Sequence, residues 1–298
     1  MFDDERQLNS DQAARVAVRK PSWLTVKPFG GEEYQRVTAL LDGLGLHTVC
    51  QEANCPNRGE CFNRGTTVFL LMGPTCTRNC RFCNVRPGLT RPLDLNEPGR
   101  VAEAASRLQL RHVVITSVTR DDLADGGASH FATTVREVRS KLPSCTIEVL
   151  TPDFRGSESA LATVMQSSPD IFNHNIETVP RLYAEIRPAV EYRRSLEVLR
   201  RARHSHNACT KSGLMVGLGE TADELKQVFG DLTDTGVSIL TIGQYLAPSR
   251  DHFGVVRYYH PDEFVLLEAW ARDAGIGTVI SGPLVRSSYL ADVIAERL

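Results

Sequence analysis

Six of the eight cysteines in this chain of 298 residues lie between positions 50 and 83. They form two groups of three, which are Cys50, Cys55 and Cys61, and then Cys76, Cys80 and Cys83. Thiolates are soft ligands that select zinc, copper(I) or iron–sulfur clusters. A disulfide scaffold is not expected in a chain of this length without an export signal. The clustering therefore predicts metal chemistry.

The second group offers three thiolates from one tight loop, with the spacing Cys76-x3-Cys80-x2-Cys83. A structural zinc site needs four ligands in a closed arrangement, usually from two Cys-x2-Cys pairs. This loop has no neighbouring histidine and no fourth cysteine. A four-iron cluster on three thiolates keeps one iron open for an outside ligand. We therefore expect a [4Fe–4S] cluster here, with zinc as the alternative.

With Phe82 before its last cysteine, this spacing resembles the signature of the radical S-adenosylmethionine superfamily. The resemblance implies that the open iron binds the amino and carboxylate groups of S-adenosylmethionine. One electron from the cluster would then break a C–S bond and give a 5′-deoxyadenosyl radical. Thiolate-ligated clusters can reach the low potential that this needs. The fold implied is a partial (β/α)6 barrel.

The first group of cysteines narrows the resemblance to one family of this superfamily. The run from Cys50 through Cys55 to Cys61 resembles the auxiliary-cluster motif of the lipoyl synthase family. That family pairs the motif with a C-terminal Arg-Ser-Ser-Tyr, which here is Arg286-Ser287-Ser288-Tyr289. In the family a serine of this motif is the fourth ligand of the auxiliary cluster. We place that ligand at Ser288, with Ser287 as the alternative; read alone, the motif would be a helix N-cap.

Further segments carry the same resemblance, which runs from about residue 21 to residue 291. They are Met72-Gly73-Pro74-Thr75, Ser117-Val118-Thr119-Arg120-Asp121-Asp122-Leu123, Asp125-Gly126-Gly127, Asn173-His174-Asn175-Ile176-Glu177-Thr178 and Gly217-Leu218-Gly219-Glu220-Thr221. All ligand positions of the family motif are present.

The resemblance implies a reaction. Sulfur would be inserted at C6 and C8 of an octanoyl group that is bound to a lysine of a lipoyl carrier domain or of the glycine-cleavage H protein. Two molecules of S-adenosylmethionine would be used per lipoyl group, and the auxiliary [4Fe–4S] cluster would donate the sulfur. A low-potential electron donor such as ferredoxin or flavodoxin is expected. Ser288 would leave as the cluster is dismantled, because an alkoxide matches iron less well than thiolate.

Arg286 is the second residue to which we assign a catalytic role, either as a hydrogen-bond donor near the auxiliary cluster or in sulfur transfer. The alternative is a surface or capping arginine. For S-adenosylmethionine, Phe82 is expected against the adenine, and Ser117, Asn175 and Glu177 near the ribose and carboxylate.

Gly217 ends a glycine-containing run, residues 213–217, that would let the adenine lie close to the backbone. For the polar residues among these contacts, ordinary strand-end hydrogen bonding is the alternative. The Gly-Gly-Glu contact that the superfamily uses for the methionine amine is not evident after the second strand.

The elements that must position these residues alternate along the chain. Continuous apolar runs, typical of strands buried on both faces, occupy residues 67–72, 112–116, 146–150, 171–176, 213–218, 238–245 and 277–280. Helical patterns occupy residues 98–108, 129–142, 157–166, 193–204, 222–235 and 262–274. This alternation predicts parallel strands with helical crossovers, in a doubly wound sheet or a barrel.

Polar and glycine-rich residues follow several strands, which favours a barrel with its chemistry at the carboxyl ends of the strands. We predict an α/β fold, a partial (β/α)6 TIM-type barrel with N-terminal and C-terminal extensions that cover the barrel mouth. The N-terminal extension, with the auxiliary-cluster cysteines, is residues 1–66. The barrel is residues 67–260, and the C-terminal extension with the Arg-Ser-Ser-Tyr motif is residues 261–298.

Net charge and the length of the apolar stretches limit the classes of partner expected for this chain. The net charge of −2 lacks the basic excess of a nucleic-acid binder, and no stretch approaches the roughly twenty apolar residues of a membrane span. We expect a cytoplasmic protein. A basic segment at residues 193–206 could dock an acidic carrier domain or be a solvated helix face. Cys145 and Cys209 are expected to be small buried apolar residues.

Three other functions compete with this interpretation. A different radical S-adenosylmethionine enzyme, such as a biotin synthase relative, would not carry the first cysteine group together with the C-terminal motif. A two-cluster electron carrier would have a shorter chain and four cysteines per cluster. A structural zinc module would contain no iron.

Overall fold

The computed structural model describes residues 19–26 and 29–295. Its centre is an eight-stranded sheet in the order β1-β2-β5-β6-β7-β8-β9-β10. The strands are β1 (His47–Thr48), β2 (Val68–Leu71), β5 (His112–Ser117), β6 (Thr146–Leu150), β7 (Ile171–Asn173), β8 (Cys209–Val216), β9 (Ile239–Gln244) and β10 (Thr278–Gly282). β1 runs antiparallel to β2, and the other neighbours are parallel.

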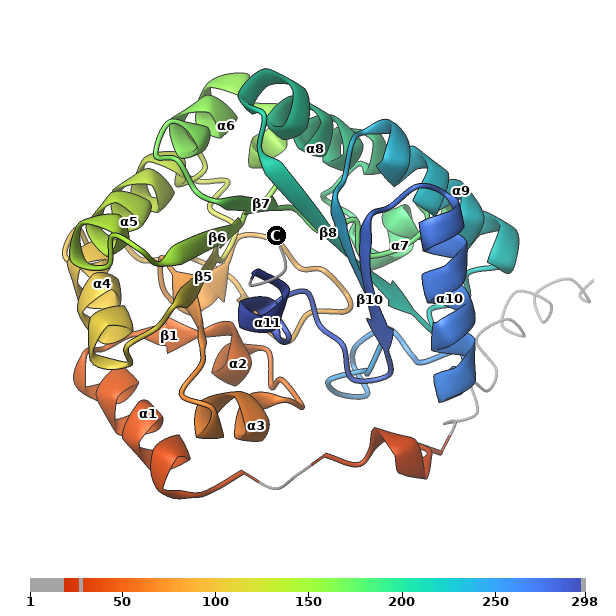
Figure 1. Cartoon of the computed structure of the whole chain (residues 1–298), viewed down its shortest axis with the longest axis horizontal. Helices are drawn as coiled ribbons and strands as arrows, with labels where there is room; N and C mark the ends of the chain where they lie inside the picture. Colours follow the sequence, from red (N-terminus) through yellow and green to blue (C-terminus); the bar gives the residue numbers. More distant parts are fainter. Residues whose placement is uncertain (1–18, 27–28, 296–298) are drawn as a thin grey trace, which may run out of the picture.

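A long helix follows each of six parallel strands, from β2 to β9, and the short α7 (Tyr183–Ile186) precedes the long helix after β7. The long helices are α4 (Glu97–Arg107), α5 (Ala128–Lys141), α6 (Glu158–Met165), α8 (Tyr192–His206), α9 (Ala222–Asp234) and α10 (Pro261–Asp273). Figure 1 shows them around the outside of the curved sheet. β2 and β9 are buried along their whole length, as expected of strands covered on both faces, whereas the edge strand β10 is mostly half-buried. The predicted partial (β/α)6 barrel is confirmed, and β10 adds one more parallel strand.

Local sequence explains where helices begin. Thr221 and Glu224 form a capping box that opens α9, with Thr221 N donating to Glu224 Oε2 at 2.8 Å. Pro261 is the first residue of α10, where its missing N–H costs nothing. No helix in the described ranges is long and apolar enough to pass through a membrane.

The N-terminal segment holds α1 (Glu32–Gly43), α2 (Val49–Glu52) and α3 (Arg58–Asn63). In Figure 1 it lies across the open side of the sheet, between β1 and β10. After β10 the chain turns into the curve of the sheet and ends in α11 (Ala291–Ala295), which contacts β5. Thus the two extensions occupy the opening and the inside of the curve. The predicted boundaries at residues 66/67 and 260/261 stay predictions, and residues 1–18 and 296–298 lie outside the described ranges.

Glycines in β8 and β9 make room for this C-terminal segment. A Cβ on Gly243 would lie 2.0 Å from the Val285 carbonyl oxygen. A Cβ on Gly213 would lie 2.7 Å from Asn175 Oδ1 and 3.2 Å from Ser287 Cβ. Because real Cβ atoms do not approach so closely, the segment can cross the inside of the sheet only where these strands lack side chains.

The inner face of the sheet also holds a charged pair. Glu148 and Lys211 are fully buried, and Lys211 Nζ lies 3.0 Å from both carboxylate oxygens. Asn173 Nδ2 donates to Glu148 Oε1 at 2.8 Å, and His112 Nε2 lies 3.5 Å from Oε2. Burial opposes ionisation of Glu148, but Lys211, His112 and Asn173 outweigh it and lower its pKa to about 2. The carboxylate is therefore ionised inside the barrel.

Candidate active site

The second cysteine group lies on the loop that follows β2. Two short strands, β3 (Thr75–Cys76) and β4 (Arg86–Pro87), pair in parallel and frame this loop. The Cys76 sulfur accepts hydrogen bonds from Thr119 N at 3.3 Å and from Arg78 N at 3.4 Å. N–H donors stabilise a thiolate and raise the potential of a bound cluster. The backbone after β5 therefore positions the first sulfur.

Cys80 and Cys83 are held from the opposite side of the loop. Arg81 N donates to the Ile186 carbonyl at 2.9 Å, and the His252 ring lies 3.1 Å from the Cys83 carbonyl oxygen. Burial raises the pKa of Cys83 to about 12, and the nearby Cys80 and Cys76 thiolates add to the rise. Three partly buried thiolates gathered on one loop need a cation between them, and an iron–sulfur cluster fits this donor set.

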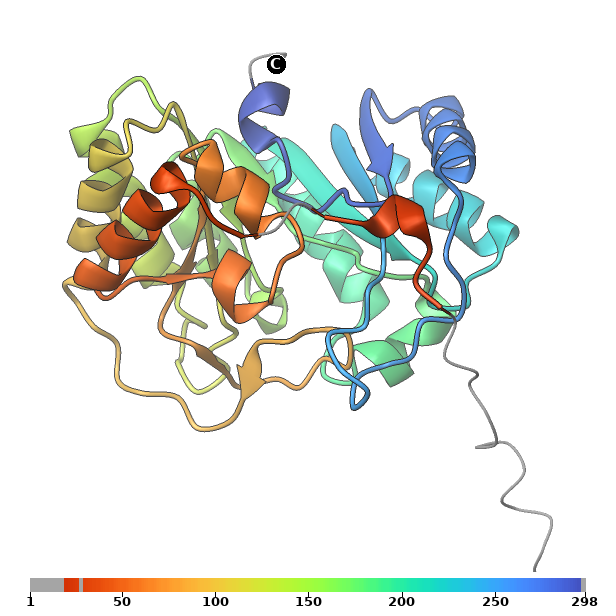
Figure 2. The ribbon, with the colours of Figure 1, turned by 90° about the horizontal axis from the view of Figure 1, so that it is seen from below.

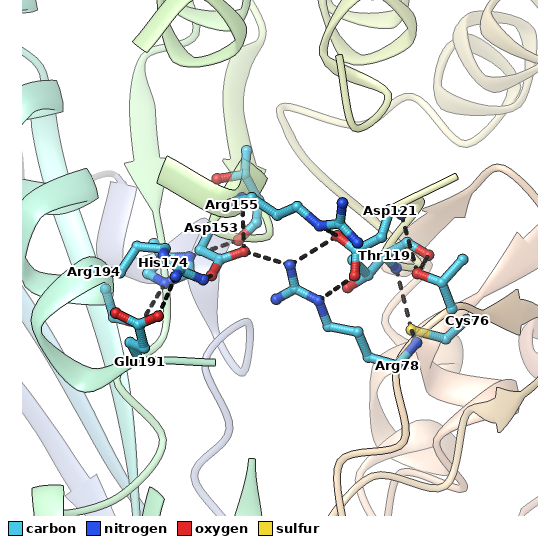
Figure 3. A network of polar contacts seen from close by, with 12 residues as sticks. Cys76, Arg78, Thr119, Asp121, Asp153, Arg155, His174, Glu191 and Arg194 are labelled. Carbon is cyan, nitrogen blue, oxygen red and sulfur yellow. Dashed lines mark hydrogen bonds and ion pairs between the residues drawn. The ribbon is translucent and has the colours of Figure 1, made fainter. Parts of the chain in front are cut away.

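A buried ion network ties this loop to the sheet (Figure 3). Arg78 forms two hydrogen bonds with Asp121, at 2.7 and 2.9 Å, and reaches Asp153 at 2.7 Å. Asp153 also meets Arg194 at 3.3 Å, and Arg155 meets Asp121 at 3.2 Å. Burial opposes the charge of Arg78, but the two carboxylates outweigh it and raise its pKa. The cysteine loop is thus fixed to the carboxyl ends of β5 and β6.

The predicted polar contacts for S-adenosylmethionine gather at neighbouring strand ends. Ser117 closes β5, and Asn175 and Glu177 follow β7. Asn175 Nδ2 donates to Glu177 Oε1 at 3.0 Å, whereas Asn175 Oδ1 and Ser117 Oγ are buried without a hydrogen-bond partner in the described part of the chain. Burial raises the pKa of Glu177, and Arg187 opposes the rise. Two unpartnered buried acceptors fit a polar ligand better than ordinary strand-end bonding.

The other two residues predicted to contact S-adenosylmethionine are Phe82 and Gly217. Phe82 is partly buried and packs against the hydrophobic core of the C-terminal half of the barrel. Gly217 has φ +99°, and a Cβ there would lie 2.1 Å from Gln244 Nε2 and 2.6 Å from the Arg257 carbonyl oxygen. Packing of Gln244 therefore already requires glycine at this position. Contacts of both residues with adenine stay predictions.

Replacing Asn175 by alanine is expected to weaken binding of S-adenosylmethionine by about three- to tenfold, since one hydrogen bond to the ligand is worth about 0.5–1.5 kcal/mol. Equilibrium dialysis on anaerobically reconstituted protein would measure the dissociation constant. Asn96→Ala is the matched control, because Asn96 is exposed and its side chain makes no cap hydrogen bond. Equal affinity of both variants would assign Asn175 a structural role only.

The first cysteine group lies in the N-terminal segment, with Cys50 in α2, Cys61 in α3 and Cys55 between them. A pocket is lined by Cys50 and Cys61 together with Ser288 and Tyr289. Burial raises the pKa of Cys50 to about 12 and that of Cys61 to about 12, and the Cys55 thiolate adds to both. As in the second group, ionisation of these sulfurs requires a cation. The set fits a cluster with Ser288 as the candidate oxygen ligand.

Contacts between α3 and the C-terminal segment close this pocket. Tyr289 Oη donates to Glu60 Oε1 at 3.1 Å, and Arg64 pairs with Asp292 at 2.7 Å. Asn57, at the start of α3, donates to the Leu284 carbonyl at 2.7 Å. The segment that carries Ser288 is therefore anchored beside Cys61 from both sides.

Neighbouring residues of the Arg-Ser-Ser-Tyr motif face different surroundings. Ser287 packs toward Gly213, whereas Ser288 lines the pocket with the cysteines. Arg286 is partly buried, and its guanidinium donates to the Val285 carbonyl at 2.6 Å. Burial lowers the pKa of Arg286, and the nearby Cys55 thiolate opposes the change. Arg286 is thus an inward arginine beside a cysteine, unlike the surface or capping alternative.

A single-ion site does not fit these cysteines. Within residues 19–26 and 29–295, no three cysteine, histidine or acidic side chains are arranged to hold one metal ion. In a cubane cluster each sulfur binds a different iron, so its thiolates stand farther apart than the ligands of one zinc.

The two cysteines outside these groups are Cys145 and Cys209. Cys145 is buried as expected, and Cys209 at the start of β8 is partly buried. In the basic segment, Arg200 and Arg201 both pair with Glu197, at 2.7 and 2.6 Å. These pairs on α8 favour the solvated helix face, and docking of a carrier there stays a prediction.

Sequence reasoning missed the residues that hold the site from outside the motifs. Arg78 and Asp153 form the buried network, and Arg187 donates to the Asn175 carbonyl at 3.1 Å while its charge lies near Cys80. One signal was available, since Arg78 stands between two ligand cysteines. Asp153 and Arg187 carry no such signal, because only the fold brings them to the loop.

Comparisons with known proteins agree with this geometry. The sequence pattern of the Radical SAM superfamily matches residues 70–232. The lipoyl synthase of Nitratidesulfovibrio vulgaris (strain Hildenborough) is 55% identical over 285 residues, covering 96% of this chain and 95% of the relative. That of Caldanaerobacter subterraneus subsp. tengcongensis is 55% identical over 279 residues, covering 93% and 98%. Among solved structures, methylornithine synthase aligns with a TM-score of 0.52 at 13% identity, covering 71% of this chain and 69% of its own.

A partial barrel with a three-cysteine loop after its first parallel strand, matched by this superfamily, defines a radical S-adenosylmethionine enzyme. Enzymes of this class use a [4Fe–4S] cluster and S-adenosylmethionine. The identity over nearly the whole chain goes further: the chain belongs to the lipoyl synthase family. This membership decides against the biotin synthase relative, the electron carrier and the zinc module.

Proposed function

We propose that this enzyme inserts sulfur at C6 and C8 of an octanoyl group bound to a lysine of a lipoyl carrier domain or of the glycine-cleavage H protein. Two molecules of S-adenosylmethionine are consumed per lipoyl group. The observation that carries the proposal is the surroundings of Gly213. Asn175, a predicted contact of S-adenosylmethionine, and Ser287, next to the predicted cluster ligand, both approach this one position on β8.

The residues divide into two sets. Cys76, Cys80 and Cys83 hold one cluster, and Ser117, Asn175 and Glu177 bind S-adenosylmethionine. Cys50, Cys55, Cys61 and Ser288 hold the other cluster. When bound, the first cluster supplies the electron that cleaves S-adenosylmethionine, and the second supplies the sulfur.

The unreactive carbons of the octanoyl chain explain why the site needs both sets. No acid or base in a protein removes hydrogen from C6 or C8, so a carbon radical is needed. The strand-end residues hold the source of that radical beside β8, where Asn175 and Ser287 both approach Gly213. Arg286, beside Cys55, is positioned to donate a hydrogen bond near the auxiliary cluster.

Partners and location follow from the proposal. The substrate is the octanoylated carrier, and a low-potential donor such as ferredoxin or flavodoxin supplies electrons. A cytoplasmic location, where reduced thiols persist, suits both clusters.

Turnover of an octanoyl-lysine peptide tests the function. Anaerobically reconstituted protein is incubated with the peptide, S-adenosylmethionine and dithionite, and the products are followed by mass spectrometry. We expect lipoyl-lysine, with 5′-deoxyadenosine formed at about two per product, because each of the two C–H bonds consumes one radical. Protein that holds zinc, or that cleaves S-adenosylmethionine without forming a C–S bond, would overturn the proposal.

Replacing Ser288 by cysteine is expected to preserve the iron content and to abolish lipoyl formation, because a thiolate does not leave the cluster as an alkoxide does. Ser287→Cys is the matched control, since Ser287 packs toward Gly213 and does not line the cysteine pocket. Iron analysis and peptide turnover are measured for both variants. Full activity of Ser288→Cys would refute the ligand role.

A further inference from the structure

Two leucines next to the radical-forming site are almost completely exposed. Leu89 is 98% exposed and Leu95 is 81% exposed, both on the loop of residues 86–95 that joins β4 to α4. In Figure 2 this part of the chain lies along the lower rim of the molecule, on the side away from α11. Two large apolar side chains so fully exposed on one short segment are available for contact with another molecule.

The loop is held in place despite its exposure. Gly88 N donates to the Cys76 carbonyl at 2.9 Å, so Leu89 is the residue directly after a hydrogen bond to a cluster cysteine. Thr90 Oγ1 donates to Asp122 at 2.9 Å, and Asp94 accepts from Asn96 N at 2.9 Å. Leu89 therefore lies on a preformed segment that is one hydrogen bond away from Cys76, and Leu95 lies further along the same segment.

Two arginines on this loop differ from three other arginines of the chain, which each pair with an aspartate. The side chains of Arg86 and Arg91 are exposed and form no hydrogen bond or ion pair with another side chain among the described residues. The neighbouring Arg78, Arg100 and Arg120 each pair with an aspartate at 2.7 Å. The surface of the loop therefore carries uncompensated positive charge around its apolar residues. Such a surface attracts and orients an acidic partner.

We propose that the loop of residues 86–95 is the docking surface of a small acidic protein that carries a low-potential one-electron centre. The acidic rim of the carrier would face Arg86 and Arg91, and Leu89 and Leu95 would fill the apolar centre of the contact. The carrier loses one electron per S-adenosylmethionine cleaved, and the cluster on the cysteine loop gains it through Cys76. No proton or atom is transferred in this step. The inference rests on the proposed function only in its demand for that electron.

Charge complementarity fits either acidic partner, and the hydrogen bond to Cys76 favours the electron carrier over the acyl carrier. The acyl chain must reach the inner face of the sheet near Gly213, whereas Leu89 makes almost no contact with the rest of the chain. An electron needs only a short path to the cluster, and the hydrogen bond from Gly88 to Cys76 provides one.

The test compares Leu89→Asp/Arg91→Glu with wild type, using reduced flavodoxin or dithionite as reductant and the octanoyl-lysine peptide as substrate. Stopped-flow loss of the visible absorbance of the cluster gives its rate of reduction independently of turnover. With flavodoxin we expect reduction and turnover to fall at least about tenfold, and the dependence of the rate on salt to weaken. With dithionite we expect the variant to match wild type. Val265→Asp, an exposed apolar residue on α10, is the control and should behave as wild type.

Other results would overturn the inference. Equal rates with flavodoxin would exclude docking at this loop, and a fall with dithionite as well would give the loop a purely structural role. If only turnover of the whole octanoylated carrier protein fell, the loop would serve the acyl carrier. Failure of wild type to form lipoyl-lysine with dithionite would instead refute the proposed function, while flavodoxin-driven reduction of the cluster would still test the docking surface.

Discussion

A chain in which Cys50, Cys55 and Cys61 are all replaced by alanine is expected to cleave S-adenosylmethionine and yet form no lipoyl group. The second cysteine group lies on a separate loop, held by Thr119 and by the Arg78 network, and its contact with the N-terminal segment is the hydrogen bond from Asn84 to the Glu52 carbonyl at 3.0 Å, which does not need the cysteine side chains. Radical formation should therefore survive. Sulfur insertion should disappear, because its proposed source has lost three of its four ligands.

Iron analysis, 5′-deoxyadenosine and lipoyl-lysine are measured together on anaerobically reconstituted protein. Iron should fall from about eight to about four per chain, as expected for loss of one of two four-iron clusters. The variant with alanine at Cys76, Cys80 and Cys83 should also keep about four irons but form no 5′-deoxyadenosine. Cys145→Ala, which removes a cysteine outside both groups, should match wild type. Lipoyl formation by the first variant would contradict an auxiliary sulfur source.

Replacing Lys211 by methionine is expected to destabilise the fold by about 3–5 kcal/mol, because it leaves the carboxylate of Glu148 buried without its cation. Lys211 and Glu148 are both fully buried, so water cannot compensate. For a protein of this size, the melting temperature should fall by roughly 5–15 °C. Anaerobic thermal melting followed by circular dichroism measures the effect, and Lys226→Met on the exposed face of α9 is the control.

The dependence on pH should reverse in this variant. In wild type the folded-state pKa of Glu148 is lowered to about 2, so its contribution is present above the ordinary carboxyl value of 4.5 and is lost as the pH falls toward 2. Without Lys211, burial becomes the dominant influence and raises the pKa of Glu148. Protonation then favours folding, so the variant should lose stability as the pH rises.

Melting at pH 5 and pH 8 distinguishes the two cases. The double variant Glu148→Gln/Lys211→Met should recover much of the loss at pH 8, since no buried charge is left uncompensated. Equal melting temperatures of Lys211→Met and Lys226→Met would show that the buried pair has no net effect.

Sequence patterns located most strands closely because these strands are apolar along their whole length. The expected strand at residues 146–150 coincides with β6, and that at 112–116 lacks only the last residue of β5. The strand expected at 213–218 begins four residues late, since β8 starts at Cys209. Lys211 interrupts the apolar pattern there. Its charge is neutralised by Glu148, two strands away, which no local pattern reveals.

The residues of the candidate site likewise include some that the sequence identified and some that it did not. The cysteines were identifiable by type and spacing, because the chemistry of a cluster demands thiolates close together. The end of β7 was placed too late, at residue 176, because the apolar Ile176 continues the pattern although Glu177 already adopts a left-handed backbone with φ 65°. Arg187 and Asp153 could not be assigned, since their role depends on tertiary contacts alone. The choice of Ser288 over Ser287 stays a prediction that the cysteine variants above can test.

The anchoring of the C-terminal segment to α3 has a consequence for how the enzyme is made. Glu60 and Tyr289, which join the two, are 229 residues apart in sequence. At about 5–20 residues per second, the ribosome needs on the order of 10 to 45 seconds to travel between them. During that interval the nascent chain carries its N-terminal thiols without Ser288, the proposed fourth ligand. If Ser288 has that role, the proposed auxiliary cluster can be completed only after translation has passed residue 288, and premature termination before it would leave the site without its oxygen ligand.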